Sequence, residues 1–326
     1  MAALHTHYLG LSLKNPFVAS SSGLTGTLAG IAKCAECGAS AVVLKSLFEE
    51  QIDAEIGSMV DEQIAIHPEA QDYLTGLGKV HGPDTYLKLI ADAKAETGIP
   101  IIASVNCVSS QWWVDFSKQI EQAGAAALEL NIGVIPQVPA EDSNQLEARI
   151  VDTVRAVKAR ISIPIAVKIG PYFTSLPTLL EKLVQAGADG IVLFNRFYRL
   201  DIDTEKLSFI TGKMTSTPEE LHLGLRWVAL LAPTIKVPIS LSTGVHSADD
   251  AIKAILVGAQ VVQIASVLYS KKTTYLQTMI DETTAWLDQH GHASLDDIRG
   301  RLSAKNAEAK AVLSRIQYIK ALTGVS

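Results

Sequence analysis

Short, almost entirely apolar runs recur along the chain, and most alternate with longer segments whose apolar residues have helical spacing. Four of these segments end in a Gly-Ala pair followed directly by an apolar run, at Gly38, Gly124, Gly187 and Gly258. Glycine supplies the left-handed turn that stops a helix. Three other runs open with proline. Proline has no backbone N–H to donate, and the first residue of a strand does not need one. The pattern predicts eight strands, at residues 17–22, 41–46, 100–106, 127–132, 164–170, 190–195, 238–243 and 261–266.

Short apolar strands that alternate with helices indicate a parallel sheet covered on both faces, and eight such units close a (β/α)8 TIM barrel. A doubly wound open sheet is the alternative, but no Gly-x-Gly-x-x-Gly follows any strand. We expect one domain over residues 1–326 with two additions. One is a lid or insertion at 47–84, which leaves the catalytic face after the second strand, and the other is a C-terminal helical extension at 305–326.

The composition fits a globular protein and argues against several partners. Hydrophobic residues make up 48% of the chain, charged residues 19%, and the formal net charge is −6. Without a basic run, nucleic acid and anionic membranes are poor partners. No apolar stretch is long enough to span a bilayer and the N-terminus has no leader pattern, so we expect a cytoplasmic protein. Cys34 and Cys37 have metal-site spacing but no second pair, so we expect ordinary helix positions and no metal.

Polar residues collect at the C-terminal ends of the predicted strands, which share one face of a barrel. Lys45 and Lys168 each lie in an otherwise apolar strand, and a buried ammonium group needs an anion or strong acceptor nearby. Ser242–Gly244 and Ala265–Ser266 are small residues at the ends of strands seven and eight, where barrels commonly bind phosphate. The helix that Ser247 would cap could assist. These features predict an anionic, phosphate-bearing cofactor.

Five segments follow one another as they do in the dihydroorotate dehydrogenase family, whose members are FMN-containing barrels. They are residues 15–18, 45–46, 128–131, 167–173 and 262–266. The chain resembles the soluble class 1 branch most. The similarity extends over nearly the whole sequence and leaves out only its C-terminal end.

The resemblance implies a role for each matching position. The flavin ring and ribityl chain would contact Ser20, Ser21, Lys45, Ser46, Asn131 and Lys168. The phosphate would be bound by Ser242, Thr243, Gly244, Ala265 and Ser266. Lys168 would lie beside N1 of the ring and stabilise the anionic reduced flavin. Lys45 is a catalytic candidate, and Asn131 and Asn195 would contact the substrate.

The substrate half of the family pattern is missing. Val134 stands where the family has the cysteine that removes a proton, and Pro136 replaces the asparagine that follows. The family's orotate-binding lid motif and its glycine-rich segment after strand six also have no counterpart. Loss of a general base costs about 10²- to 10⁴-fold in rate. Arg196 could bind a substrate carboxylate through a two-point fork. Cys107 is the leading replacement base, and the others are His67, Tyr73, Glu141 and Asp142.

Three functions fit this combination. The first is an FMN-dependent oxidoreductase acting on CH–CH bonds, with hydride transfer between flavin N5 and a small anionic substrate that differs from dihydroorotate, and with a second electron acceptor as partner. The second is a non-catalytic flavin-binding protein, and the third is a dihydroorotate dehydrogenase with a relocated base. No iron–sulfur or flavin-adenine module is visible, and a homodimer is expected only as the commonest soluble oligomer.

Overall fold

The structure is a computed structural model that describes residues 2–48, 83–106, 111–133, 142–196 and 199–305, and isolated positions beyond. Eight parallel strands pair side by side, and the pairing of β4 with β6 closes the ring. This confirms the predicted barrel, with every strand one to three residues shorter than expected. The strands are β3 (Phe17–Ala19), β4 (Ala41–Val43), β6 (Ile101–Asn106), β7 (Ala127–Asn131), β8 (Ile165–Ile169), β9 (Gly190–Leu193), β12 (Ile239–Ser242) and β13 (Val261–Ile264).

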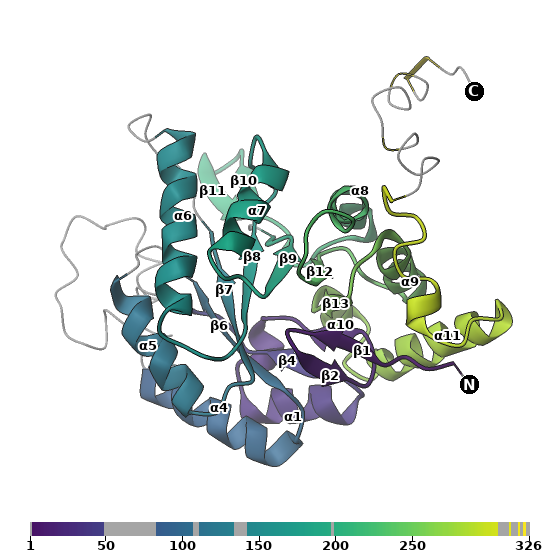
Figure 1. Cartoon of the computed structure of the whole chain (residues 1–326), viewed down its shortest axis with the longest axis horizontal. Helices are drawn as coiled ribbons and strands as arrows, with labels where there is room; N and C mark the ends of the chain where they lie inside the picture. The colour runs from purple at the N-terminus through teal and green to yellow at the C-terminus, as the bar shows by residue number, and fades with distance from the viewer. Residues whose placement is uncertain are drawn as a thin grey trace.

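Helices surround the barrel (Figure 1). Gly38, Gly124, Gly187 and Gly258 follow four of them with φ between 94° and 115°, which confirms the glycine stops. Cys34 lies in a helix and Cys37 directly follows it, as expected, and both are free cysteines. The helices are α1 (Leu28–Glu36), α4 (Pro83–Thr97), α5 (Gln111–Gln122), α6 (Ser143–Lys158), α7 (Leu176–Gln185), α8 (Leu221–Leu231), α9 (Ala248–Val257), α10 (Ser266–Ser270) and α11 (Tyr275–Gln289), with 3-10 turns η1 (Gly23–Thr25), η2 (Pro218–Glu220) and η3 (Leu295–Asp297).

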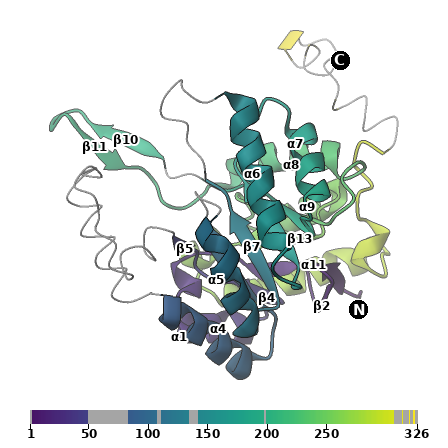
Figure 2. The same ribbon diagram turned by 60° about the vertical axis from the view of Figure 1, so that its left-hand side comes forward.

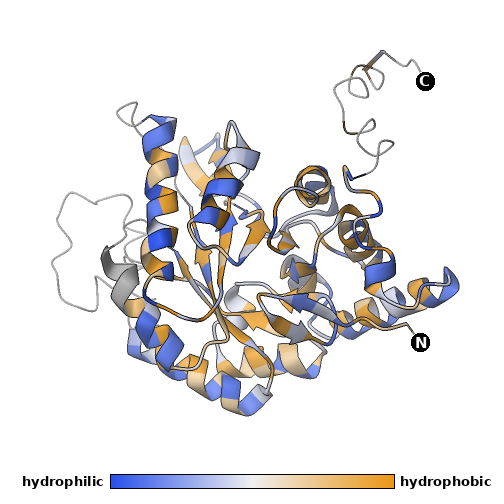
Figure 3. Ribbon diagram, viewed as in Figure 1, coloured by the Kyte–Doolittle hydropathy of each residue, from blue (hydrophilic) through white to orange (hydrophobic). Residues whose placement is uncertain are grey.

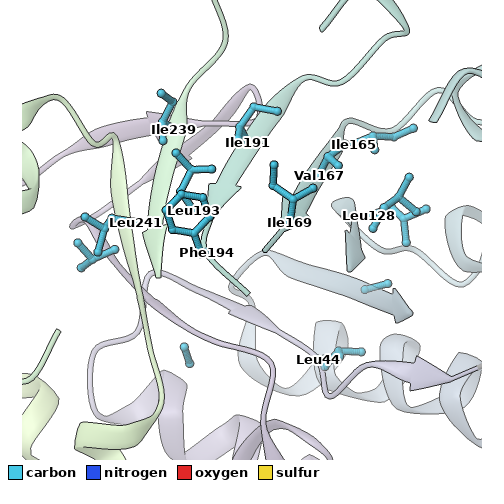
Figure 4. Close-up of a cluster of buried hydrophobic side chains, with 14 of the residues drawn as sticks. Leu44, Leu128, Ile165, Val167, Ile169, Ile191, Leu193, Phe194, Ile239 and Leu241 are labelled. Carbon is cyan, nitrogen blue, oxygen red and sulfur yellow. The ribbon is translucent and has the colours of Figure 1, made fainter. Parts of the chain in front are cut away.

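Alternate strand residues face two separate cores, because successive side chains of a strand point to opposite faces. The outward set packs against the helices and is visible in Figure 4, with Leu128, Val167, Leu193 and Leu241 among its members. The hydropathy colours agree, since the strands are largely apolar and the helices carry both kinds of residue (Figure 3). The layer between barrel and helices therefore holds the larger core.

The inward set is closed off at the N-terminal ends of the strands by a hairpin that the sequence pattern did not predict. Strands β1 (Thr6–Tyr8) and β2 (Leu11–Leu13) pair antiparallel. Their buried side chains form a core with residues at or near the strand starts, namely Tyr8, Leu9 and Leu13 with Val18, Ala41, Val43, Ile102, Ala127, Ala166, Val192 and Val261. Any cavity inside the barrel must therefore open toward the C-terminal ends.

Two smaller features lie at the opposite end. Strand β5 (Leu47–Phe48) continues beside β6, and the hairpin of β10 (Leu200–Asp203) and β11 (Ser208–Thr211) projects from the body (Figure 2). The ends of the predicted 47–84 insertion form β5 and the start of α4. Its middle, and nearly all of the predicted 305–326 extension, lie outside the described residues. Among the described helices, none has the length and apolar character needed to cross a membrane.

Candidate functional site

A cavity of about 460 Å³ lies at the C-terminal ends of the strands, within the usual range for small-molecule sites. Polar residues that follow β3, β9, β12 and β13 form much of its wall, and Lys168 of β8 joins them. Eleven expected cofactor residues and one further substrate residue were named from the sequence. Those that line this cavity are Ser20, Ser21, Lys168, Asn195, Ser242, Thr243, Gly244, Ala265 and Ser266, whereas Lys45, Ser46 and Asn131 do not.

The turn after β12 is the tightest part of the wall. Thr243 and Gly244 both have left-handed backbone, with φ of 79° and 82°. A Cβ on Gly244 would lie 2.2 Å from the backbone nitrogen of Leu221, so α8 starts directly against this turn. Non-glycine residues held in left-handed conformations tend to cluster at functional sites. Thr243 is such a residue, and its neighbours present backbone and hydroxyl groups to the cavity.

Ser216, which no sequence motif marks as a site residue, connects this turn to the end of β13. Its backbone N–H donates to Ser266 Oγ at 2.8 Å, and its own Oγ accepts from Gly244 N–H at 3.4 Å. The Oγ also lies 3.1 Å from Nε2 of His246. Burial lowers the pKa of His246, and the positive charge of Lys271 lowers it further against the opposing effect of Asp250. Ser216 belongs to the segment that replaces the family's glycine-rich stretch, so only tertiary structure places it here.

The helix expected to assist phosphate binding is not the one at the cavity. Ser247 does cap α9, where its Oγ accepts the Asp250 N–H at 3.2 Å. The first turn of α9 already carries Asp249 and Asp250, and the latter accepts the His246 N–H at 2.9 Å. No residue of α9 lines the cavity, whereas α10 begins at Ser266 on its wall. Ser247 is thus confirmed as a helix cap, but the helix that starts at the cavity is α10 rather than α9.

Lys168 is buried, 5% exposed, and finds its anion within the barrel itself. Its Nζ lies 3.5 Å from Glu129 Oε1 in an ion pair, 3.2 Å from Gln263 Oε1 and 3.4 Å from Ser20 Oγ. Glu129 is fully buried, and its Oε2 accepts from Gln263 Nε2 at 2.6 Å. Lys168 therefore has the anion and the strong acceptor that its burial requires, but β7 and β13 supply them and no ligand is needed, contrary to the expectation.

A second polar cluster joins the ends of β4, β6 and β7. Ser46 Oγ lies 3.1 Å from Ser21 Oγ and 2.8 Å from Ser104 Oγ, and it accepts from Asn131 Nδ2 at 3.4 Å. Tyr86 of α4 fixes this strand end, since its hydroxyl donates to the Ser104 carbonyl and accepts its N–H. Asn131 Oδ1 is buried and has no hydrogen-bond partner among the described residues. Ser21 connects this cluster to the cavity, so Ser46 and Asn131 stand behind its wall.

Lys45 lies beside this cluster and is half-buried. Burial lowers the pKa of its ammonium group. Within the described part of the chain, no hydrogen bond or ion pair is formed by this group. Lys168 has an ion-pair partner and Lys45 has none among the described residues. Lys45 therefore matches the prediction of a lysine whose positive charge is available to an anionic ligand.

Arg196 lines the cavity, but its guanidinium group is already engaged. It donates from Nε to Glu220 Oε2 at 2.9 Å and to the carbonyls of Lys213 and Met214 at 3.1 Å. Burial raises the pKa of Glu220, but hydrogen bonds from Arg196 and Thr217 outweigh burial and leave the pKa lowered. The two-point fork predicted for a substrate carboxylate is thus occupied by Glu220. Arg196 instead holds the segment that contains Ser216.

Several sequence candidates cannot be placed. Cys107, the expected replacement base, and Val134, expected at the family's proton-removing position, lie outside the described residues, as do His67, Tyr73 and Glu141. Asp142, the remaining alternative base, caps α6, where its Oδ1 accepts the Gln145 N–H at 2.9 Å. Among the described residues, no group of three or more histidine, cysteine, aspartate or glutamate side chains is arranged to bind a metal.

Comparison with known proteins identifies the family of this chain. The sequence profile of the family described as dihydroorotate dehydrogenase matches residues 3–287. The chain belongs to the dihydroorotate dehydrogenase family. It is 32% identical over 285 residues to dihydroorotate dehydrogenase A (fumarate) of Lacticaseibacillus paracasei, covering 81% of this chain and 91% of the relative.

A second relative differs in the acceptor that its name gives. The chain is 29% identical over 310 residues to the catalytic subunit of dihydroorotate dehydrogenase B (NAD(+)) of Anoxybacillus flavithermus, with coverage of 90% and 93%. One relative is thus named for fumarate and the other for NAD(+). Membership of the dihydroorotate dehydrogenase family therefore establishes an oxidoreductase lineage and leaves the electron acceptor open.

Proposed function

We propose that the chain is an FMN-dependent oxidoreductase that acts on a CH–CH bond of a small anionic substrate other than dihydroorotate, with a second electron acceptor. The observation that carries the proposal is the cavity at the C-terminal face, whose wall contains most of the residues expected for the cofactor. Family membership supports the same reaction class. When bound, FMN supplies the hydride acceptor and donor at N5 of its ring.

The residues present fit this cofactor. The cavity volume of about 460 Å³ is adequate for a ligand of this size class. Hydroxyl and backbone donors from the ends of β12 and β13 suit a phosphate group, which backbone N–H groups commonly bind. Asn131 Oδ1 provides a buried acceptor that lacks a partner among the described residues, and burying such a group unpaired is unfavourable. A polar ligand behind Ser21 would satisfy it.

Each group has a distinct task in this proposal. Ser242, Thr243, Gly244 and the α10 start at Ser266 bind the phosphate, and Ser216 holds these two turns together. Ser20, Ser21 and Lys168 on the cavity wall would contact the ring and ribityl chain, and Ser46 would support Ser21 from behind the wall. Asn195 on the wall would orient the substrate through its amide, and Asn131 would offer its unpaired Oδ1 to a ligand group that reaches past Ser21. Lys45 supplies an ammonium group that has no ion-pair partner among the described residues, which suits an anionic substrate.

Val134 supports a substrate other than dihydroorotate. A valine side chain has no group that can accept a proton, and the family resemblance implies that Val134 stands at the position of the proton-removing cysteine. A general base contributes about 10²- to 10⁴-fold, so dihydroorotate oxidation should be correspondingly slow.

The test uses the FMN-loaded protein under anaerobic conditions. The flavin is photoreduced and mixed in a stopped-flow instrument with fumarate, with NAD⁺ and with a soluble quinone, and reoxidation is followed near the visible flavin absorbance. We expect at least one acceptor to reoxidise the flavin faster than oxygen does. If none does, the chain is a non-catalytic flavin-binding protein.

Dihydroorotate is tested separately against the oxidised protein. We expect no bleaching of the flavin on the timescale of enzyme turnover. Rapid bleaching that a Cys107→Ser variant abolishes would contradict our proposal and favour a dihydroorotate dehydrogenase with a relocated base.

A further inference from the structure

We propose that Glu129 is a positioning residue that sets the charge Lys168 presents to the flavin, an inference that rests on the proposed FMN site. Glu129 does not line the cavity, whereas Lys168 does. The ammonium group therefore lies between the carboxylate and the ligand. Glu129 acts on the flavin through this ion pair rather than by contact.

The geometry of the pair is tightly constrained. Three oxygen atoms lie within 3.5 Å of Lys168 Nζ, one each from Glu129, Gln263 and Ser20. Gln263 and Ser20 accept hydrogen bonds from the ammonium group, whereas Glu129 Oε1 interacts with it as an ion pair and has no hydrogen-bond partner among the described residues. Gln263 also donates to the second carboxylate oxygen of Glu129 at 2.6 Å. Glutamate, glutamine and lysine thus fix one another at the floor of the cavity.

Two tyrosines also lie close enough to Glu129 to interact with its charge. Tyr8 of the plugging hairpin faces it from the N-terminal side; burial raises the pKa of this tyrosine well above its usual value, and Glu129 raises it further. Tyr86 of α4 faces it from the β6 side; burial raises its pKa, partly opposed by the Ser104 hydrogen bond, and Glu129 adds to the increase. Lys168 is the ion-pair partner of Glu129 among the described residues. A charge in such a water-poor interior acts more strongly than it would in solvent.

The ion pair determines the sign of the effect on the flavin. Paired with Glu129, Lys168 forms a net neutral unit beside the cavity. Without the carboxylate, the unit would carry a full positive charge. Reduced flavin is anionic, so an unpaired positive charge nearby favours the reduced form. Glu129 therefore lowers the reduction potential of the bound flavin.

The test measures the reduction potential of bound FMN by equilibration with a reference dye. For Glu129→Gln we expect the ratio of reduced to oxidised flavin at a fixed poise to rise at least tenfold, equivalent to about 30 mV more positive for a two-electron couple. Lys168→Met should shift the ratio in the opposite direction. The double variant again carries no net charge at this position, like the wild-type pair, so its ratio should return to within about threefold of the wild-type ratio.

A matched control removes the same charge from an exposed pair. Glu36 and Lys33 form an ion pair on α1 with side chains 65% and 54% exposed. Glu36→Gln should leave the potential unchanged, because exposed charges are screened by solvent. A Glu129→Gln variant whose potential matches that of Glu36→Gln overturns the inference.

A second measurement needs no flavin. Removing one partner of a buried ion pair leaves an uncompensated charge, whereas removing both is often tolerated. Glu129→Gln should therefore lower the thermal unfolding midpoint of the apoprotein, and adding Lys168→Met should raise it again. A double variant no more stable than the single one overturns the ion-pair argument. A wild-type protein that binds no FMN overturns the proposed function. The role of Glu129 toward the flavin then fails as well, even if thermal unfolding confirms the Glu129–Lys168 ion pair.

Discussion

Gly244 marks the closest approach between the turn after β12 and the start of α8, and replacing it with alanine tests that contact. The added Cβ would lie 2.2 Å from Leu221 N, 2.6 Å from Leu221 Cα and 2.8 Å from Glu220 C, at a φ of +82°. All three are backbone atoms, so the two segments must separate by roughly 1 Å to reach normal contact. We add about 1–2 kcal/mol for left-handed strain and about 1–3 kcal/mol for overpacking, or roughly 2–5 kcal/mol in total.

Two other glycines separate these contributions. Gly98 has a φ of +64° and open space around its Cα, so Gly98→Ala should cost only the strain of about 1–2 kcal/mol. Gly224 lies inside α8, where a Cβ first meets Leu241 at 3.4 Å, so Gly224→Ala should stabilise by about 0.4–1 kcal/mol. Thermal unfolding followed by circular dichroism should rank Gly224→Ala above wild type, then Gly98→Ala, then Gly244→Ala.

The difference should be easy to measure. A loss of roughly 2–5 kcal/mol corresponds to a fall of roughly 3–7 °C in the unfolding midpoint of a chain of this size. Because Gly244 also lines the cavity, the same variant should bind FMN at least tenfold more weakly in a fluorescence titration. A Gly244→Ala protein that melts no lower than Gly98→Ala would refute the close approach of the turn and α8.

Three further changes test other parts of the site. Arg196→Ala should release the segment that contains Ser216, because Arg196 holds it through Glu220. FMN should then dissociate several-fold faster, as measured by flavin fluorescence, and an unchanged rate would contradict this role of Arg196. Burial lowers the pKa of His246 in the folded protein, so the unfolded chain binds the proton more readily and stability should fall as the pH drops below about 6.5. His246→Asn should reduce this pH dependence of the unfolding midpoint. Equal slopes in the two proteins would contradict the prediction. Tyr86→Phe leaves the Ser104 N–H unpaired and should lower the unfolding free energy by about 1–3 kcal/mol in urea denaturation, whereas a neutral change would mean that water replaces the hydroxyl.

The barrel could be predicted from the sequence because its signals are local. A glycine with left-handed backbone ends a helix wherever it stands, and Gly38 and Gly258 were interpreted correctly without any knowledge of their neighbours. The hairpin β1–β2 gave no comparable signal, because its strands are three residues long and their burial depends on the barrel that they close.

The polar contacts inside the barrel required the register of the strands. Asn131 pairs with Lys168 across β7 and β8, so Glu129, two residues before Asn131, faces the same interior as Lys168. Strands that are apolar on both faces do not show which alternate residues point inward. The sequence therefore did not identify Glu129 as the partner of Lys168, and the anion for Lys168 was sought in a ligand. Ser216 and Gln263 were missed for the same reason, since each acts through neighbours distant in sequence.

The visible absorbance spectrum of the purified protein tests the FMN site most directly, combined with identification of the flavin released on denaturation. We predict an oxidised-flavin spectrum that arises from one FMN per chain, and loss of most of that flavin in the Gly244→Ala variant. A colourless protein that takes up no FMN when the cofactor is supplied in excess would contradict the account.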